Sequence, residues 1–544
     1  MAEKKNTATG DFDAVILEIL WTRLISIVDE GAKAIVRTAF STLSNEANDF
    51  ACVLTDARGR SLAQNSGSIP SFIATLPATV RHFLDAIGAE NMRPGDILIT
   101  NDPWKGTGHL PDVCIVQPVF FGARLVAFAA TTSHVPDIGG RIRALEAREI
   151  YEEGLQIPLT KLSDGGVIND QLVDIIRLNV RTPDQTMGDI WAQVGAGGLM
   201  ADRLLAMMSD YSLADLTGLA DELFRRCEVA MRAAISAVPD GVYGYVMETD
   251  GMDIAFRYEV ALSIEGDAIS ADFTGTTAAQ PRAINCPMTY TYAMTAYAVK
   301  CALLPDLANN DGMFRPITVT APEDCLVNPR YPAAVSARAG TGHYVPVVVF
   351  GALGQAVPDR VMAGAGSPLW AITQTGHRDD GSAYANVLFF NGGMGALADK
   401  DGESCLSWPS NISSTPVEVA ERNAPLLIRE KKLRPGSGGA GRHRGGLGQD
   451  VEMVCTSERP IAMMFMAERT RVPAPGFAGG GQGGLGSVEI NGEAVNHRTQ
   501  HILQKGDVVV VRTPGGGGYG VAAERSGSAV EVDAARGYAS DNEH

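Results

Sequence analysis

The first predicted element is a long amphipathic helix near the start of the chain. Between residues 11 and 41, apolar residues recur at intervals of three and four, which places them on one face of an α-helix. Asp11 or Asp13 could cap its N-terminus. The sequence FIATLPATVRHFLDAIGAE, residues 72–90, predicts a second helix. The apolar positions of the first helix are Val15, Ile16, Ile19, Leu20, Leu24, Ile27 and Val28.

Strand patterns surround a loop of unusual composition. Residues 49–64 fit two strands joined by a tight turn at 56–59, and ILIT at 97–100 fits a short buried strand. The segment NDPWKGTGHLPDVC follows at residues 101–114. Its prolines lack backbone donors and its glycines raise the entropy cost of order, so a helix interior is excluded and a fixed loop is predicted.

A β-hairpin is predicted directly after this loop. Two apolar, β-rich runs within residues 113–132 flank a turn at 122–123. If the residues on either side of a two-residue turn pair directly, Asp112 lies opposite Ser133; a loop longer by one residue would place it opposite His134. In both registers Asp112 and His134 meet at the open end of the hairpin, because paired and diagonal positions lie within about 4.5–8 Å.

Helical and strand patterns alternate along the rest of the chain. Helices are predicted at 171–182, 188–208, 219–238, 290–304 and 344–357, with a strand meander at 241–275. Many of the 60 glycines lie in the last hundred residues. We expect the glycine clusters at 436–450, 474–486 and 513–520 to form tight turns between short strands.

The coarse prediction is an α+β protein without clear linkers. It combines an N-terminal helix and hairpin metal-binding region, a helical middle and a glycine-rich β-strand C-terminal region. One catalytic unit is expected over residues 11–521, with the metal-binding part at about 41–162 and the β-rich part at about 380–521. Residues 1–10 are expected to be a polar tail and 522–544 a disordered tail.

Composition and charge indicate which kinds of molecule the protein could bind. The chain has 544 residues, 45% hydrophobic and 20% charged, the balance of a soluble globular protein. A formal net charge of −18 argues against nucleic acid or an anionic membrane as the main partner, because both would repel it. The polar start and the short apolar runs predict a cytoplasmic protein with no membrane span. The eight cysteines show no CxxC pairing and are expected to be small buried residues.

Candidate metal ligands gather around the hairpin. His109, Asp112 and His134 offer nitrogen and carboxylate oxygen, which suits Zn, Mn or Fe(II). Asp49 and Asp137 are candidate further carboxylates. Two alternatives stay open at this point: both histidines could simply hydrogen-bond in a buried hairpin end, or they could form a catalytic dyad without a metal.

Other clusters carry weaker predictions. Arg338 and His343 flank a glycine turn that could open a helix, and could contact a substrate carboxylate or phosphate; the alternative is a capped helix start. The glycine clusters contain no P-loop motif, and no GxGxxG occurs between a predicted strand and a predicted helix, so a phosphate-binding role is not favoured. The basic side chains of residues 442–444 could meet an anionic substrate or an acidic partner surface, or lie in a solvated turn.

Several motifs resemble those of the hydantoinase B/oxoprolinase family, in the same order and over about residues 11–521. They include NDPWKGTGHLPDVCIVQPVF, SHVPDIGG, EEGLQIP, DFTGTTAAQPRAINCP, PAAVSAR, GSGGAGRHRGGLGQ and KGDVVVVRTPGGGGYG. The resemblance implies that His109, Asp112 and His134 are metal ligands, and Asp49 looks like a fourth. Many relatives read THLPD and SHHADIGG where this chain has Gly108 and Val135–Pro136, which leaves the ligand types intact but alters the pocket beside the metal.

The resemblance implies a subunit that works with a hydantoinase A-type ATP-binding partner in a hetero-oligomer. We expect an ATP-dependent hydrolase that opens a cyclic amide, a hydantoin, 5-oxoproline or a lactam, with ATP and Mg bound by the partner. One divalent transition metal, Zn or Mn or Fe, would activate water, and Asp137 would act as the catalytic base or orient His134. The alternatives are a subunit of an ATP-dependent ketone carboxylase and a structural subunit with a vestigial metal site.

Overall fold

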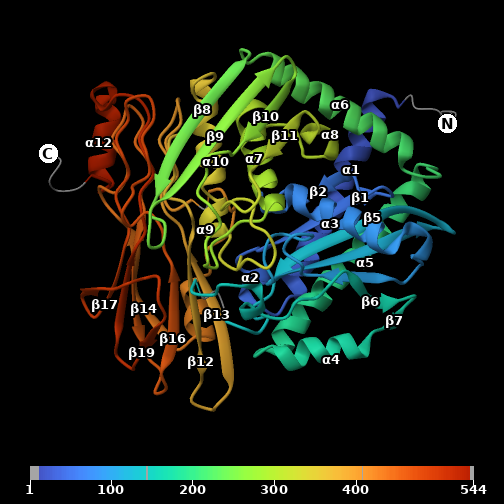
Figure 1. Ribbon diagram of the computed structural model, residues 1–544, viewed down its shortest axis with the longest axis horizontal. Coiled ribbons are helices and arrows are strands. Elements are labelled where there is room, and N and C mark those ends of the chain that lie inside the picture. The colour runs from blue at the N-terminus through green and yellow to red at the C-terminus, as the bar shows by residue number, and fades with distance from the viewer. Residues whose placement is uncertain (1–11, 142–144, 407, 540–544) are drawn as a thin grey trace.

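The computed structural model describes residues 12–141, 145–406 and 408–539, and confirms the α+β class. The sheets lie in an N-terminal, a central and a C-terminal part of the chain, which are arranged around the centre of the molecule (Figure 1). The N-terminal half forms a seven-stranded sheet with helices on its faces, a four-stranded sheet with central helices follows, and the C-terminal part contains two further sheets. None of the helices in these residues is long and apolar enough to cross a bilayer.

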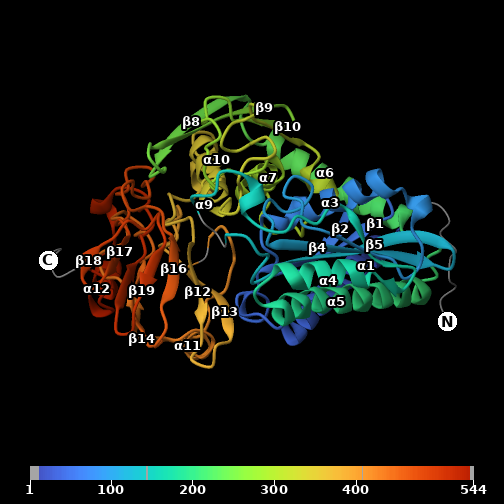
Figure 2. The same cartoon turned by 60° about the horizontal axis from the view of Figure 1, so that its bottom comes forward.

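The N-terminal sheet has the strand order β2-β1-β5-β4-β3-β6-β7. Alternate side chains of its central strands point to opposite faces: Cys52 and Leu54 pack against α1 and α5, whereas Val53 packs against α3. Figure 2 shows α5 running along one face of this sheet. The strands are β1 Phe50–Asp56, β2 Ser61–Gln64, β3 Ile97–Thr100, β4 Asp112–Phe121, β5 Arg124–His134, β6 Thr160–Asp164 and β7 Val167–Ile168. The helices of this half are α1 Ala14–Thr38, α2 Thr42–Asn45, α3 Phe72–Ile87, α4 Asp170–Asn179, α5 Pro183–Asp210 and α6 Thr217–Ser236.

The first helix forms as predicted, although only part of its apolar stripe is buried. Asp13 caps it by accepting a hydrogen bond from the Val15 backbone N–H, and Asp11 lies outside the described residues. Leu20 and Leu24 are fully buried, whereas Val15 is 63% exposed.

The hairpin of β4 and β5 combines both registers that the sequence left open. Phe121 pairs with Arg124 beside the turn, as in the first register. A bulge next to Val119 then shifts the pairing by one residue, so that Asp112 lies opposite His134 rather than Ser133. The loop length was therefore predicted correctly, and the unpredicted bulge decides the pairing at the site.

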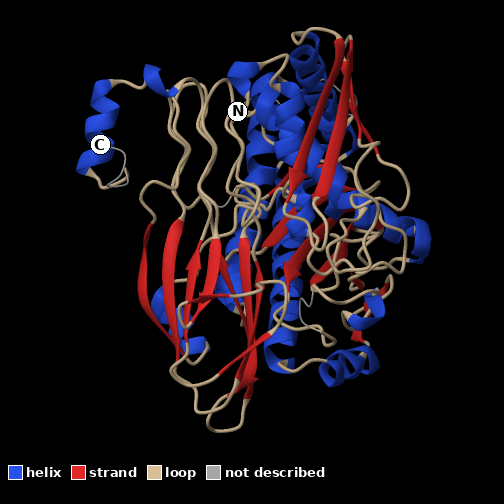
Figure 3. Cartoon of the chain, turned by 60° about the vertical axis from the view of Figure 1, so that its left-hand side comes forward, coloured by secondary structure: helices blue, strands red, loops and turns tan. Residues whose placement is uncertain are grey.

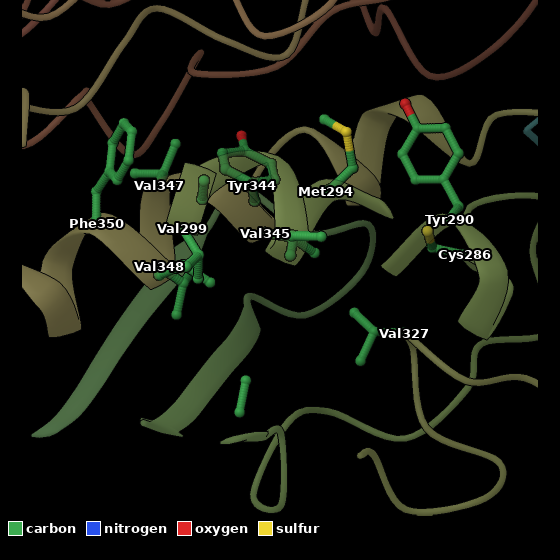
Figure 4. Packing of buried hydrophobic residues seen from close by; sticks show 14 of the residues in the cluster. Cys286, Tyr290, Met294, Val299, Val327, Tyr344, Val345, Val347, Val348 and Phe350 are labelled. Carbon is green, nitrogen blue, oxygen red and sulfur yellow. The ribbon is translucent and has the colours of Figure 1, made fainter. Parts of the chain in front are cut away.

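A helical pair fills the centre of the molecule. Helices α7 and α10 pack between the four-stranded sheet β11-β10-β9-β8 and the rest of the chain, and Figure 4 shows side chains of both, including Met294 and Val348, in one buried cluster. The strands are β8 Gly241–Thr249, β9 Phe256–Glu265, β10 Ala268–Asp272 and β11 Ile317–Thr320. The helices are α7 Met288–Leu303, α8 Asp311–Phe314, α9 Ala339–Gly342 and α10 Val345–Leu353.

The C-terminal part is a β-sandwich. Its sheets have the orders β13-β12-β16-β19 and β14-β15-β20-β17-β18, and side chains from both, such as Phe465 and Val511, share one core. The elements are β12 Trp370–His377, β13 Ala383–Phe390, α11 Val417–Asn423, β14 Leu426–Leu433, β15 Gln449–Cys455, β16 Ile461–Met466, β17 Ser487–Ile490, β18 Glu493–Ala494, β19 His501–Leu503 and β20 Val508–Arg512.

The prediction that the glycine clusters form tight turns is wrong. They are extended segments that hydrogen-bond to one another through their backbones, for example from the Gly439 N–H to the Gly516 carbonyl at 2.8 Å. In Figure 3 long loops run side by side above the strands of the sandwich. A Cβ on Gly515 would lie 1.7 Å from the Ser437 carbonyl oxygen, and its φ is outside the left-handed region. Glycine is needed here for close backbone approach, not for turn geometry.

The described part of the predicted disordered tail is also ordered, which corrects that prediction. Residues 522–524 form a 3-10 turn and α12 spans Gly527–Ala535. Arg525 pairs with Asp401 at 2.7 Å and with Asp533 at 2.6 Å, and Arg444 lies 3.3 Å from Asp533. The basic cluster of the glycine region therefore has acidic partners within its own chain.

Candidate metal centre

Three buried side chains converge where the hairpin strands meet. His109 lies in the loop before β4, Asp112 is the first residue of β4, and His134 is the last residue of β5. Asp112 Oδ1 lies 2.8 Å from His109 Nε2 and 3.0 Å from His134 Nδ1, and the two imidazole nitrogens are 3.1 Å apart. The predicted trio therefore forms one cluster of potential ligand atoms.

The surrounding contacts orient this cluster. His109 Nδ1 donates to the Ser336 carbonyl at 2.8 Å, which leaves Nε2 with its lone pair directed at the centre. The other oxygen of Asp112 accepts from Thr107 Oγ1 at 2.7 Å and from Arg338 at 2.5 Å. Burial alone would raise the pKa of Asp112, but His109, when its imidazole is protonated, and the Arg338 guanidinium hold it well below its usual value.

The donor set fits a divalent transition metal. Two imidazole nitrogens and one carboxylate oxygen are ligands that Zn, Mn and Fe(II) accept. The three donor atoms lie 2.8, 3.0 and 3.1 Å from one another, so all of them could bind a single ion. Asp49 directly precedes β1, and its Oδ2 lies 4.0 Å from His134 Nδ1, so a fourth candidate carboxylate lies beside the trio.

A small cavity of about 40 Å³ adjoins the cluster. That volume holds a few water molecules. Its walls come from distant parts of the chain, including Phe72 at the start of α3, Tyr290 of α7, Phe389 of β13, Ile412 and Met466 at the end of β16. The cluster of His109, Asp112 and His134 is thus covered by the central helices and the C-terminal sandwich, which lie outside the part of the chain that the sequence predicted to bind metal.

Arg338 and His343 line this cavity, but in different ways. The Arg338 guanidinium donates to Asp112 and, at 2.7 Å, to the Thr107 carbonyl, and it lies 4.6 Å from the centroid of the Tyr290 ring. His343 is 2% exposed, stacks on Tyr290 at 6.5 Å, and its Nδ1 has no hydrogen-bond partner in the described part of the chain. Burial, with the Arg338 charge nearby, lowers the pKa of His343 to about 3, so the imidazole is neutral.

Asp137 lies apart from the residues that line the cavity. Its Oδ1 accepts from the Gly139 N–H at 3.0 Å and from the Arg181 guanidinium at 2.8 Å, and its Oδ2 accepts from the Arg181 backbone N–H. The carboxylate is therefore held by the loop that follows His134 and by the segment before α5.

Sequence reasoning gave no role to Ser336, whose carbonyl accepts from His109, or to Glu153, whose carboxylate accepts from the Ser336 backbone N–H. Ser336 lies in the PAAVSAR motif and Glu153 in EEGLQIP, so the signal was a motif without an assigned role. Nothing in the local pattern of α7 separated Tyr290 from ordinary core residues.

With this geometry established, comparison with known proteins decides the family. The model of the family described as hydantoinase B/oxoprolinase matches residues 13–522. The chain belongs to the hydantoinase B/oxoprolinase family. A protein from Pseudomonas sp. (strain NS671), described as one of the subunits of a D-/L-hydantoinase, is 29% identical over 98% of this chain and 94% of its own length.

Solved structures agree with this family fold. The ATP-dependent caprolactamase from Pseudomonas jessenii is 25% identical with a TM-score of 0.89, over 98% of this chain and 95% of that one. Acetone carboxylase in its nucleotide-free form has a TM-score of 0.89 at 17% identity, over 98% of this chain and 80% of that one, and shares the fold. The hydantoinase relative and a caprolactamase relative from Pseudomonas jessenii, which is 27% identical over 97% of this chain and 94% of its own length, are each described as one subunit of their enzyme.

Proposed function

We propose that this chain is the metal-containing subunit of an ATP-dependent amidohydrolase that opens a cyclic amide, namely a hydantoin, 5-oxoproline or a lactam. The observation that carries the proposal is the buried trio of His109, Asp112 and His134 at the wall of a cavity. Family membership supports the reaction class, since relatives described as a hydantoinase component and a caprolactamase cover almost the whole chain.

Within this proposal the trio and Asp49 hold one divalent transition metal, Mn, Fe or Zn. The ion would supply Lewis-acid activation of water and of the substrate carbonyl. Asp112 Oδ2 already accepts hydrogen bonds from Thr107 and Arg338, so Oδ1 is the oxygen that remains to bind the metal. The Ser336 carbonyl fixes the tautomer of His109 that has a lone pair on Nε2.

His343 is the residue we assign to the substrate. A neutral imidazole with an unsatisfied buried nitrogen gains a hydrogen bond when a polar ligand atom enters the cavity. Tyr290 fixes the ring by stacking. Arg338 acts through Asp112 rather than on a substrate carboxylate, because its guanidinium is already engaged. The two bonds from Arg181 favour an anchoring role for Asp137 over base catalysis.

ATP and Mg are assigned to a hydantoinase A-type partner, which would phosphorylate the amide oxygen. The sequence contains no GxxxxGK[ST], and its GxGxxG matches do not open an α-helix directly after a strand. Activation of the amide by the partner and attack by water at this chain's metal centre would then be divided between two subunits. A hetero-oligomer is therefore part of the proposal.

The test is to purify the chain with a hydantoinase A-type partner and measure phosphate release from ATP. The panel contains hydantoins, 5-oxoproline, lactams and ketones, each with and without bicarbonate. We expect release with a cyclic amide, independent of bicarbonate and lost after metal removal. Release only with a ketone and bicarbonate would instead show a carboxylase. Robust ATP cleavage by the isolated, homogeneous chain would contradict the assignment of ATP to the partner.

A further inference from the structure

The turn formed by residues 335–338 braces two of the three candidate ligands at once. The Ser336 carbonyl accepts the Nδ1–H of His109 at 2.8 Å. Two residues later, Arg338 donates to Oδ2 of Asp112 at 2.5 Å. Any displacement of this turn would therefore rotate both a histidine and a carboxylate of the metal centre.

One buried carboxylate holds this turn in place. Oε1 of Glu153 accepts from the backbone N–H groups of Val335 at 2.9 Å and Ser336 at 2.8 Å. The side chain is 3% exposed. Upstream, the Ile150 N–H donates to the Pro332 carbonyl at 2.9 Å, so the segment before Glu153 runs beside the segment before the turn.

The backbone around Glu153 also packs on the loop that leaves the third ligand, His134. The Leu155 N–H donates to the Ile138 carbonyl at 2.9 Å. A Cβ on Gly140 would lie 2.5 Å from the Glu153 carbonyl carbon, and Gly140 has a φ of +57°. Glu153 thus lies between the loop after His134 and the turn that braces the other two ligands.

We propose that Glu153 is a positioning residue for the metal centre. By fixing the N–H groups of the turn, it sets the orientation of His109 and Asp112 without touching the metal or the substrate. This role rests on the proposed function, since it presupposes that the centre holds a metal. Glu153 belongs to the EEGLQIP motif and the turn belongs to PAAVSAR, so this role explains why the two motifs contact each other.

The acceptor geometry, rather than the negative charge, is what this role requires. Burial raises the pKa of Glu153 to about 7, although the Ser336 and Val335 N–H groups favour the charged form. Its Oε2 is buried without a hydrogen-bond partner in the described residues. A neutral side chain of the same length can therefore accept both hydrogen bonds, whereas a shorter charged one cannot reach them.

The experiment measures metal affinity, by competition with a chromogenic chelator using Mn²⁺ and Co²⁺, in the full-length protein. Glu153→Ala and Glu153→Asp are expected to bind metal about 10- to 100-fold more weakly, the usual cost of losing a contact that orients a ligand. Glu153→Gln is expected to stay within about threefold of wild type, because its amide oxygen replaces Oε1. The matched control is Glu152→Ala, the preceding residue and the last of the 3-10 helix Ile150–Glu152; its carboxylate accepts from the Arg148 N–H and pairs with Arg141 rather than with the turn at 335–338.

A purely structural role would give a different pattern. The visible spectrum of the Co²⁺-loaded protein reports ligand geometry, and we expect it to change in Glu153→Asp and to match wild type in Glu153→Gln and Glu152→Ala. Circular dichroism of the metal-free proteins checks folding; if Glu153→Ala does not fold, the Asp and Gln variants still decide.

Two results would overturn the inference in distinguishable ways. If wild type binds metal and Glu153→Asp binds it equally with an unchanged spectrum, the positioning role is wrong and the proposed function stands. If wild type binds neither ion, the proposed function fails and the inference fails with it.

Discussion

Gly108 lies beside the candidate metal centre, and the effect of its substitution on the free energy of unfolding can be worked out from the structure. Its φ is +102°, and a Cβ there would lie 2.5 Å from Arg338 Cδ and 2.7 Å from Arg338 Nε. The guanidinium cannot yield easily, because it is buried and held by Asp112 and by the Thr107 carbonyl. Gly108→Ala should therefore displace Arg338 from Asp112.

The expected cost has two parts. Backbone strain from a Cβ at positive φ costs about 1–3 kcal/mol. Breaking a buried ion pair costs about 3–5 kcal/mol, because one charge is left without its partner. Gly122→Ala isolates the first part, since Gly122 has a φ of +63° and no heavy atom within 4 Å of the added Cβ. Gly108→Ala should thus lower the free energy of unfolding by about 3–5 kcal/mol more than Gly122→Ala.

The assay is urea unfolding of the metal-free proteins, followed by circular dichroism and tryptophan fluorescence to check that the probes agree. A double-mutant cycle supplies the decisive comparison. In the Arg338→Ala background the clash is gone, so Gly108→Ala should cost only about 1–3 kcal/mol, the backbone strain. An equal cost of Gly108→Ala in both backgrounds would refute the reasoning.

Three further predictions concern Asp112, His343 and Gly515. Asp112→Asn should lose the metal during dialysis against a weak chelator while Asp137→Asn keeps it and is only less stable, and metal analysis showing the reverse would exchange the two roles. The pH profile of kcat/KM should contain no step from His343 between pH 5 and 9, because the pKa of this residue is about 3. His343→Leu should lower kcat/KM about 10- to 100-fold, because one hydrogen bond to the substrate is lost. An unchanged kcat/KM in this variant would show that His343 does not contact the substrate. Gly515→Ala should lower stability by several kcal/mol, about 3 or more, because the added Cβ overlaps a backbone carbonyl, whereas Gly527→Ala, with open space around it, should be nearly neutral in urea unfolding.

The hairpin shows how far local sequence pattern can reach. Two apolar runs and a short turn were enough to bring Asp112 and His134 together, because strand pairing follows from residue numbers alone. The bulge beside Val119 was not predictable, since it depends on how the strand packs against its neighbours. The proximity of Asp112 and His134 could therefore be predicted from sequence, but their exact pairing could not.

The cavity walls could not be predicted because they are long-range contacts. Tyr290, Ser336 and Met466 meet the hairpin only after the central helices and the sandwich have packed on it. Likewise, the glycine clusters have the composition of turns, and only the tertiary structure shows that Gly515 serves a close backbone approach. Residues 522–535 look polar and small in sequence, yet pairing of Arg525 with Asp401 and Asp533 orders them.

The central claim is that His109, Asp112 and His134 hold a metal, and the most direct test is elemental analysis of the purified protein and its histidine variants. The account predicts close to one transition metal ion per wild-type chain, and none in His109→Ala or His134→Ala, both still folded by circular dichroism. Full metal content in both variants would contradict it.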